Sequence, residues 1–294
     1  MNIITLRLAA GLVLFATFSL PTSTTFAQGA LTPPGAPAPT MKTLAQIEPR
    51  TPISSAPFTI SGSGSYYLTT NLTVSSGNAI TITTNGVTLD LAGFTILGTA
   101  PNATGYAVLL NSGLSDLTIC NGHIRGGVTN NGVGNYSGSG FIYGIYSPGI
   151  DPVNARVTGV SVSGCQGAGI YLGTGNSTVV ESCTVQTVGS YGIRASTVKS
   201  CSAADCGSYG ISCDQVSDCR GACTGNADGI LANTALNCEG YSSGGFGLYA
   251  YYTASGCFGY SNTGTGLNAF IASVCHGASG SGTPLTTTHN VNSF

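Results

Sequence analysis

Six cysteines recur at an almost constant spacing in the second half of this chain. The steps between them are 18, 18, 19, 19 and 18 residues, from Cys183 through Cys201, Cys219, Cys238 and Cys257 to Cys275. A glycine followed by Ile or Leu keeps the same period, at Gly169, Gly192, Gly210, Gly229, Gly247 and Gly266. Two independent markers on one period indicate stacked structural repeats.

The short repeat limits what the chain can fold into. About 18 residues are too few for two helices and their turns, but they suit three short strands joined by bends. Stacked coils of this kind pair strand to strand in parallel, about 4.8 Å apart, and bury like residues in columns. The sequence therefore predicts an all-β solenoid whose coils contain about 18–25 residues.

Apolar residues lie at fixed distances from each repeating cysteine. Three residues before it the chain carries Val or Ala, as at Val180 and Ala235. Two residues after it the side chain shrinks along the chain, from Val185 to Ala203 and then to glycine from Gly221 onward. These positions and the cysteine are predicted to point inward, into an interior that narrows toward the C-terminus.

The first 27 residues resemble a secretory signal peptide. Arg7 supplies the positive charge, Leu8 to Leu20 form an apolar run, and Thr25-Phe26-Ala27 has the small-x-small pattern of a cleavage site. A retained membrane anchor is the less favoured alternative, because the apolar run is short for a membrane span. We therefore expect a secreted, extracellular or periplasmic protein with no membrane span after removal of the signal.

The rest of the chain divides by composition. Residues 28–57 are rich in proline, including the segment LTPPGAPAPT, and are predicted to form a linker and lead-in. Residues 58–283 are predicted to form the solenoid, with an N-terminal cap and the first coils over 58–100. Residues 284–294 are predicted to be a C-terminal tail, and the Gly126 to Gly140 stretch is an insertion expected to emerge from one face.

Charge is scarce, and this excludes one class of partner. Only 6% of residues are charged, whereas 42% are hydrophobic. Nucleic-acid binding needs clustered Lys and Arg to neutralise phosphates, so no nucleic-acid partner is expected. Without Arg7 the chain has seven basic residues against ten acidic ones, a net charge near −3.

The repeat pattern resembles the right-handed parallel β-helix proteins, the pectin-lyase-like superfold, in their secreted bacterial form. The residues that carry the resemblance are Val180-x-x-Cys183-x-Val185 with Gly192-Ile193 and the copies of this unit, over about Phe58 to Gly277. The resemblance implies a right-handed parallel β-helix. In this family an inward asparagine commonly occupies the cysteine position, so its amide ladder is not expected here. The family includes polysaccharide lyases, hydrolases and adhesins, so the fold does not decide the function.

The eleven cysteines allow two interpretations. A secreted protein favours disulfides, but stacked neighbours lie farther apart than bridged cysteines prefer, and free cysteine packs as a small hydrophobe. We favour a reduced inward stack, with Cys206, Cys213 and Cys223 as candidates for local bridges. No metal site is expected, because the three histidines are scattered and no CxxC pair occurs.

A sugar-cleaving site would need converging carboxylates, and none recur in one column. The resembling lyases use calcium and a basic residue, so Ca²⁺ is expected only if this chain is a lyase; otherwise no cofactor is expected. The catalytic candidates are Arg194 or Lys199 as base, with Asp214 or Asp218 as acid or metal ligand.

The local charge also has a structural explanation. Successive coils place opposite charges side by side, Glu181 next to Lys199 and Arg220 next to Glu239. Such exposed pairs across a β-ladder stabilise a sheet modestly and need no catalytic role.

The residue after each Gly-Ile pair forms the second candidate site. If Ile points inward, this next residue points outward, and it is Tyr146, Tyr171, Arg194 and Tyr249 in four of the coils. Tyrosine rings on an exposed face can stack on sugars, although aromatic packing between coils explains them equally well. The first hypothesis is thus a noncatalytic β-helix protein of the cell surface or extracellular matrix that binds polysaccharide. The second is a polysaccharide lyase, or a hydrolase, acting on acidic polysaccharide.

Overall fold

The computed structural model describes residues 48–294, with the exception of residue 176. The predicted signal peptide, 1–27, and most of the predicted linker, 28–57, lie outside the described residues. No helix in the described part of the chain is long and apolar enough to cross a membrane.

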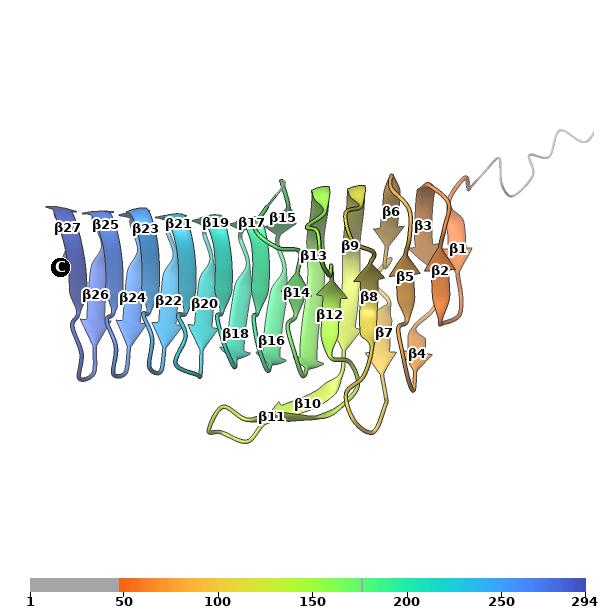
Figure 1. Cartoon of the computed structure of the whole chain (residues 1–294), viewed down its shortest axis with the longest axis horizontal. Coiled ribbons are helices and arrows are strands. Elements are labelled where there is room, and N and C mark those ends of the chain that lie inside the picture. The colour runs from red at the N-terminus through yellow and green to blue at the C-terminus, as the bar shows by residue number, and fades with distance from the viewer. Residues whose placement is uncertain (1–47, 176) are drawn as a thin grey trace, which may run out of the picture. The chain divides into compact units, whose positions relative to one another are not determined.

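The described residues form a parallel β-solenoid of about 13 turns, with coils of about 19 residues. One sheet contains 25 of the strands, and every strand pair in it is parallel (Figure 1). The predicted right-handed parallel β-helix is therefore confirmed as the fold class. Each coil has three faces, which we number by the order in which the chain passes through them.

Face 1 begins as separate short strands and later becomes the first half of longer strands. It contains β2 (Phe58–Ile60), β5 (Ile80–Ile82), β8 (Tyr106–Leu110), β12 (Tyr143–Tyr146), β14 (Ile170–Tyr171) and the first halves of β17 (Ile193–Lys199), β19 (Ile211–Ser217), β21 (Ile230–Leu236), β23 (Leu248–Ser255), β25 (Leu267–Ser273) and β27 (Leu285–Val291).

Face 2 follows face 1 around the coil. It contains β1 (Thr51–Ile53), β3 (Gly64–Leu68), β6 (Val87–Asp90), the first parts of β9 (Ser115–Arg125) and β13 (Val153–Cys165), β15 (Val179–Glu181) and the second halves of β17 to β27.

Face 3 closes the coil. It contains β4 (Leu72–Val74), β7 (Thr95–Gly98), the second parts of β9 and β13, β16 (Thr184–Val188), β18 (Ser202–Cys206), β20 (Arg220–Cys223), β22 (Glu239–Ser242), β24 (Phe258–Ser261) and β26 (His276–Ser279).

The strands reach somewhat beyond the predicted limits of the solenoid. β1 starts at Thr51, before the predicted start at Phe58, and pairs with β3. β27 lies within the predicted tail and pairs with β25 along seven residues, Leu285 to Val291. Both segments continue the columns of the neighbouring coils.

The glycine of each Gly-Ile pair lies where two faces approach each other closely. A Cβ atom on Gly192 would clash with the Gly210 carbonyl of the next coil and with the Ala203 side chain on face 3. The following Ile193 is fully buried and stacks in register on Ile170 and Ile211. The repeated Gly-Ile or Gly-Leu pair in the sequence therefore corresponds to a tight corner followed by an inward apolar residue.

A residue with positive φ turns the chain from face 2 to face 3 in successive coils. It directly precedes the cysteine position and has φ between 50° and 63° at Asn121, Gly159, Ser182, Ser200, Asp218, Asn237, Gly256, Val274 and Asn292. This left-handed conformation is costly for most residues other than glycine and asparagine. Its recurrence at one place shows that the stacking of the coils imposes the bend.

The repeating cysteines are buried in one column, as predicted, and their thiols bond the backbone at this corner. The Sγ atoms of Cys201 and Cys219 each donate to the carbonyl two residues earlier, at 3.0 Å. Cys201 Sγ also accepts from the Cys183 N–H of the preceding coil, at 3.3 Å. Thiols, and not the amides that were not expected here, thus bond the backbone at this corner from Cys183 onward.

A second inward column lies between face 3 and face 1. It runs through Cys165, Val188, Cys206, Cys223, Ser242, Ser261 and Ser279. The Ser261 hydroxyl donates to Gly245 O at 2.6 Å and accepts from Gly264 N at 2.9 Å. The serines therefore hold the turns that lead back to face 1.

All eleven cysteines have free thiols in the structure, so the candidate local bridges are not formed. Cys206 and Cys223 are neighbours in the second inward column. Cys213 lies in a different column, in register with Ala195, and this position separates it from the other two candidates.

The predicted insertion forms a separate two-stranded hairpin of β10 (Gly127–Asn130) and β11 (Tyr136–Ser139). It projects from the solenoid and runs alongside the following coils (Figure 1). The Tyr136 hydroxyl donates to the Asp205 carboxylate at 2.7 Å and lies 2.7 Å from the Thr224 hydroxyl. The hairpin is thereby fixed to coils that lie 69 and 88 residues later in the sequence.

Candidate functional site

Six tyrosines form a continuous row of rings on face 1, which we call the tyrosine ladder. Its members are Tyr106, Tyr143, Tyr146, Tyr171, Tyr191 and Tyr209. Successive ring centroids lie 4.2 to 5.8 Å apart. Contacts at these distances are typical of favourable aromatic pairs.

Two neighbouring outward positions of the coil supply these rings. Tyr146 and Tyr171 follow the inward Ile and are adjacent in the register of β12 and β14. Tyr143 and Tyr191 precede the tight glycine corner. The residue after Ile was predicted as a candidate, but the residue before glycine was not, and both are needed for the row.

Arg194 lies within the ladder. It follows Tyr171 in the register of β14 and β17, and its guanidinium lies 5.3 Å from the ring centroids of both Tyr171 and Tyr191. One nitrogen donates to the Tyr191 hydroxyl at 3.3 Å. Its Nε is buried and has no hydrogen-bond partner in the structure. No carboxylate among the described residues forms an ion pair with this guanidinium.

The ladder rings are half-buried, so each presents part of a face or an edge to solvent. Burial raises the pKa of the Tyr143, Tyr146 and Tyr209 hydroxyls, and neighbouring tyrosines add to the shift. These phenols stay protonated near neutral pH and can donate and accept hydrogen bonds. The ladder therefore offers apolar rings with polar tips and a single positive charge.

Asp228 is a carboxylate that the sequence did not mark as a site residue. It occupies the same position of its coil as Tyr209, directly before a glycine, and it is only 9% exposed. Burial raises its pKa to about 6, while the Phe246 N–H, at 2.9 Å, acts in the opposite direction. The signal in the sequence that identifies it is its position directly before glycine, which it shares with Tyr191 and Tyr209.

Tyr249 belongs to a separate aromatic group. Its ring lies 4.9 Å from Phe246 and 4.7 Å from Tyr251. In the column after Ile, Ser212 and Leu231 separate Tyr249 from Arg194. Of the four predicted binding residues, Tyr146, Tyr171 and Arg194 thus lie together, and Tyr249 lies apart.

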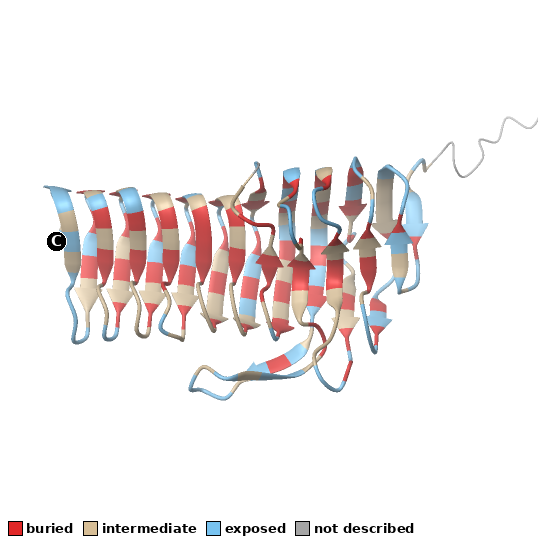
Figure 2. Cartoon of the chain, in the orientation of Figure 1, coloured by how far each residue is buried: buried red, intermediate tan, exposed pale blue. Residues whose placement is uncertain are grey.

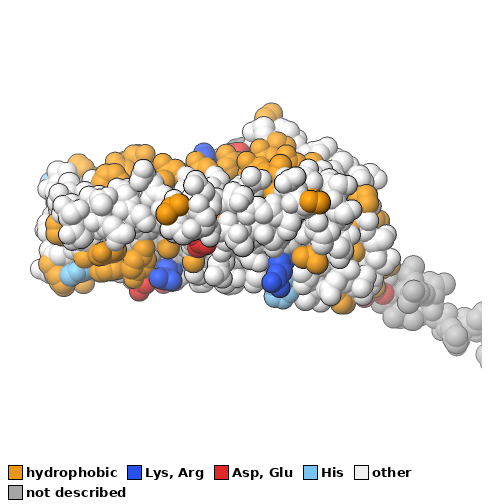
Figure 3. Space-filling view, turned by 90° about the horizontal axis from the view of Figure 1, so that it is seen from below, with side chains coloured by type: hydrophobic (Ala, Val, Ile, Leu, Met, Phe, Trp, Pro, Cys, Tyr) orange, Lys and Arg blue, Asp and Glu red, His pale blue; other side chains and the backbone are white. Residues whose placement is uncertain are grey.

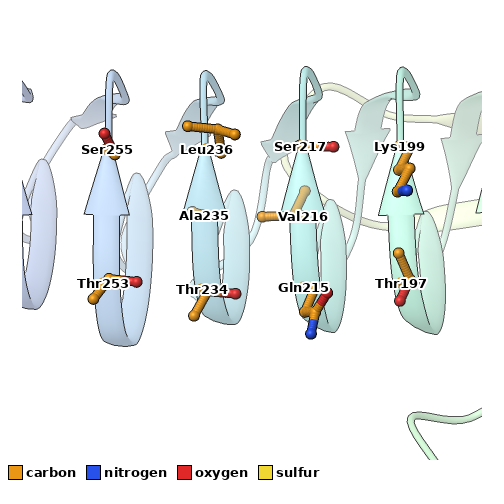
Figure 4. Close-up of a pocket in the computed structure, with 10 residues that line it drawn as sticks. All are labelled: Thr197, Lys199, Gln215, Val216, Ser217, Thr234, Ala235, Leu236, Thr253 and Ser255. Atoms are coloured by element: carbon orange, nitrogen blue, oxygen red, sulfur yellow. The ribbon is translucent and has the colours of Figure 1, made fainter.

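Lys199 lies at the end of β17 on face 2. It borders a shallow trough of about 280 Å³, whose floor contains Val216 and Ala235 (Figure 4). Thr197, Gln215, Thr234 and Thr253 form one side of this trough. Lys199 and Arg194 are five residues apart on the same strand, a separation of up to roughly 16 Å.

The two candidate acids lie at other places on the coil. Asp214 accepts a hydrogen bond from Asn233 Nδ2 at 3.0 Å. Asp218 is the left-handed corner residue of its coil, and Asn237 Nδ2 lies 3.4 Å from its carboxylate. No hydrogen bond or ion pair within residues 48–294 joins any two of Arg194, Lys199, Asp214 and Asp218.

The charge pairs predicted across the β-ladder are found in part. Arg220 and Glu239 lie in register, with their nearest charged atoms 3.9 Å apart. Glu181 and Lys199 are also in register, but the ion pair of Glu181 is with Arg156, at 3.0 Å. Glu181 and Lys199 are therefore ladder neighbours, as predicted, but Arg156 of the preceding coil forms the ion pair with Glu181.

No group of three or more His, Cys, Asp and Glu side chains in the described part of the chain is arranged to hold a metal ion. The surface has few charges in the view of Figure 3, where hydrophobic side chains gather along both long edges. No family model, curated protein or solved structure matches this chain.

Proposed function

We propose that this chain is a secreted, noncatalytic β-helix protein that binds polysaccharide at the cell surface or in the extracellular matrix, with the tyrosine ladder as its platform. The observation that carries the proposal is the unbroken row of six half-buried rings along face 1. Such a row suits a linear ligand that lies along the solenoid axis.

Sugar rings fit such a surface for a physical reason. Each pyranose has an apolar face of C–H groups that can lie on a tyrosine ring, while its hydroxyls bond the phenol tips. The coils repeat about every 4.8 Å, so ring after ring can engage consecutive parts of one polymer. The guanidinium of the half-buried Arg194, beside Tyr171 and Tyr191, adds a positively charged hydrogen-bond donor to this surface.

The separation of the four catalytic candidates supports a binding role over a catalytic one. Cleavage of a glycosidic bond needs two carboxyl groups or a base close to the same sugar. Arg194, Lys199, Asp214 and Asp218 lie at four different positions of the coil instead.

Binding can be tested by affinity electrophoresis of the protein in gels that contain soluble polysaccharides, both neutral and acidic. We expect retardation by at least one polymer. Tyr191→Ala should weaken it about tenfold, because it removes a ring between two others and the acceptor for Arg194. Tyr252→Ala is a matched control, since this tyrosine is 62% exposed and lies outside the ladder. Equal retardation of the wild type and Tyr191→Ala would contradict the assignment of the ladder.

The second candidate function is a lyase, or a hydrolase, acting on acidic polysaccharide, with Ca²⁺ needed only by the lyase. It is tested by following absorbance at 235 nm and new reducing ends after incubation with acidic polymers, with and without calcium. We expect neither signal. Unsaturated product would establish a lyase, and reducing ends alone would establish a hydrolase.

Secretion has its own test. We expect the exported protein to begin at Gln28, after cleavage behind Ala27, as N-terminal sequencing would show. An exported chain that still begins at Met1 would support the retained anchor instead.

A further inference from the structure

A long groove follows the corner between face 2 and face 3, away from the tyrosine ladder. It consists of two hollows of about 650 Å³ and about 330 Å³ that share Asn237 and Glu239. The first begins at Ser182 and the second ends at Phe294. We call this feature the corner groove; it follows the cysteine column through six coils and reaches Phe294 in a seventh.

The floor and rims of the corner groove come from three neighbouring columns of the coil. The floor is the cysteine column from Cys183 to Cys275. One rim is the column of left-handed corner residues, and the other is the first residue of each face 3 strand. The groove is thus a direct product of the bend that the stacked coils impose.

Side chains along the rims change in kind from one end to the other. Near the N-terminal end they are hydroxyls, such as Ser200 and Ser202. Near the C-terminal end they are rings: Phe258 and His276 stack with centroids 5.4 Å apart, and Phe294 meets His276 edge-on at 4.9 Å. Hydroxyls and rings along one groove are the groups that a sugar chain uses for hydrogen bonding and stacking.

Charges in the middle of the groove nearly cancel. Arg220 lies 3.9 Å from Glu239, and Asp218 lies next to Asn237, with 3.4 Å between the carboxylate and the amide nitrogen. A strongly anionic or cationic polymer would meet both signs of charge in this groove. The guanidinium, carboxylate and amide groups of these residues are planar, and each can bond two adjacent hydroxyls of a sugar.

The backbone along the groove is already satisfied. Ser200 N donates to Ser217 O, and Asp218 N donates to Leu236 O, both at 3.0 Å. On the other rim, Arg220 N donates to Cys201 O, also at 3.0 Å. A peptide that binds as an added strand needs free main-chain groups, and these rims offer none at those residues. The groove therefore favours a ligand recognised by side chains alone.

We propose that the corner groove binds one chain of a neutral polysaccharide along the solenoid axis, so that the protein, which already binds a polymer at the tyrosine ladder, joins two polysaccharide chains. The linking role rests on the proposed function of the ladder. The groove site itself does not, because it lies at a different corner of the coil, between face 2 and face 3, and uses different residues.

The test is affinity electrophoresis of the exported protein in three neutral polymers, hydroxyethylcellulose, galactomannan and soluble starch, with alginate as the acidic comparison. We expect retardation by one neutral polymer, weakened about tenfold in Arg220→Ala and in Phe258→Ala. Arg156→Ala is the matched control, because Arg156 forms a similarly exposed ion pair with Glu181 outside the groove. Retardation by alginate alone, by none of the neutral polymers, or equally in all variants would overturn the proposal.

Linking is measured as light scattering when the protein is mixed with the polymers that retard it. We expect Tyr191→Ala and Arg220→Ala each to abolish scattering while each still binds through its intact site. Loss of binding in Tyr191→Ala with normal binding in Arg220→Ala would support the ladder as a binding site and contradict binding at the groove. Normal binding in Tyr191→Ala with loss of binding in Arg220→Ala would support the groove and contradict binding at the ladder. Scattering retained in Arg220→Ala would contradict the linking role.

Discussion

The two halves of this solenoid build the same coil around different interiors. In the N-terminal half, up to residue 141, the core is built mainly of Ile, Leu and Val, including the fully buried Ile80 and Leu89, and it ends with the buried ring of Phe141. In the C-terminal half the interior consists of glycine, alanine, valine, cysteine and serine around one column of Ile or Leu. The buried polar residues, Ser147, Thr178, Ser212, Asp228, Ser242 and Ser261, all lie beyond that point. Figure 2 shows buried positions continuing through both halves.

The comparison teaches that one fold can be stabilised in two ways. Wide coils bury large apolar side chains, each of which contributes about 1.5–3 kcal/mol. Narrow coils bring their faces together, so that a Cβ atom on Gly240 would clash with the backbone of Gly247. There, thiols and hydroxyls bond the backbone of the corners, and hydrogen bonding replaces part of the apolar burial.

The largest expected effect comes from a charge placed in the cysteine column. Cys219 is 4% exposed and bonds the Ser217 carbonyl, so Cys219→Asp should lower the free energy of unfolding by about 4 kcal/mol. Urea denaturation measures the change. Cys219→Ser keeps a donor of similar shape and should cost much less, and an unchanged unfolding curve for the aspartate variant would refute the inward assignment.

A second change tests the narrow interior directly. Gly240→Val should destabilise the protein by about 3 kcal/mol, because the opposing backbone at Gly247 cannot move aside. Valine already occupies the same column at Val162 and Val185 in the wider coils. If thermal unfolding showed that Gly240→Val is neutral, the two halves would not differ in width as described.

A third change tests whether hydrogen bonds support the narrow coils. Ser261→Ala leaves Gly245 O and Gly264 N without their partner and should cost about 2 kcal/mol in urea denaturation. Val188→Ala in the same column removes packing but no hydrogen bond. Comparing the loss of unfolding free energy in the two variants separates stabilisation by hydrogen bonds from stabilisation by apolar packing.

The smallest effect is a pH dependence confined to the C-terminal half. The pKa of Asp228 is raised to about 6 in the folded state, above its value of about 3.9 in an unfolded chain. Between these values the folded state binds more protons, so the Asp228 contribution favours folding as pH falls from 7 to 4 and is lost as pH rises through 6.

Asp228→Asn should remove this contribution, a difference of about 1 kcal/mol between pH 5.5 and pH 7.5 in unfolding free energy. The measurement is urea denaturation of both proteins at the two pH values. Parallel pH profiles for the wild type and the variant would show that Asp228 is not the group that titrates.

Much of the fold followed from the sequence, because residues in one column obey one period. The inward Ile193, the buried cysteines and the shrinking positions from Val185 to Gly221 were all predicted from their spacing. The corner conformation was not, since Ser200, Asp218 and Val274 share no residue type and take positive φ only because the stacked coils demand it.

The candidate site was predicted only in the column that follows each Gly-Ile pair. Tyr146, Tyr171 and Arg194 follow Gly-Ile pairs and were found. Tyr143, Tyr191 and Tyr209 were missed because they precede the glycine, and Tyr106 was missed because its coil has no Gly-Ile pair. The contacts of the ladder join two columns, and a period cannot show which neighbouring columns touch. The period also could not show that Glu181 forms its ion pair with Arg156 of an earlier coil and not with Lys199.

The constant step of the cysteine column has a consequence for inheritance. The coils from Cys183 to Cys275 offer equivalent strands for pairing to their neighbours. Duplication or loss of a DNA segment encoding one coil of 18 or 19 residues would therefore leave every remaining strand with a suitable pairing partner. The corner groove would lengthen or shorten by the same step. Lineages that carry this gene could therefore change the reach of the protein by recombination between repeats, without redesigning any core.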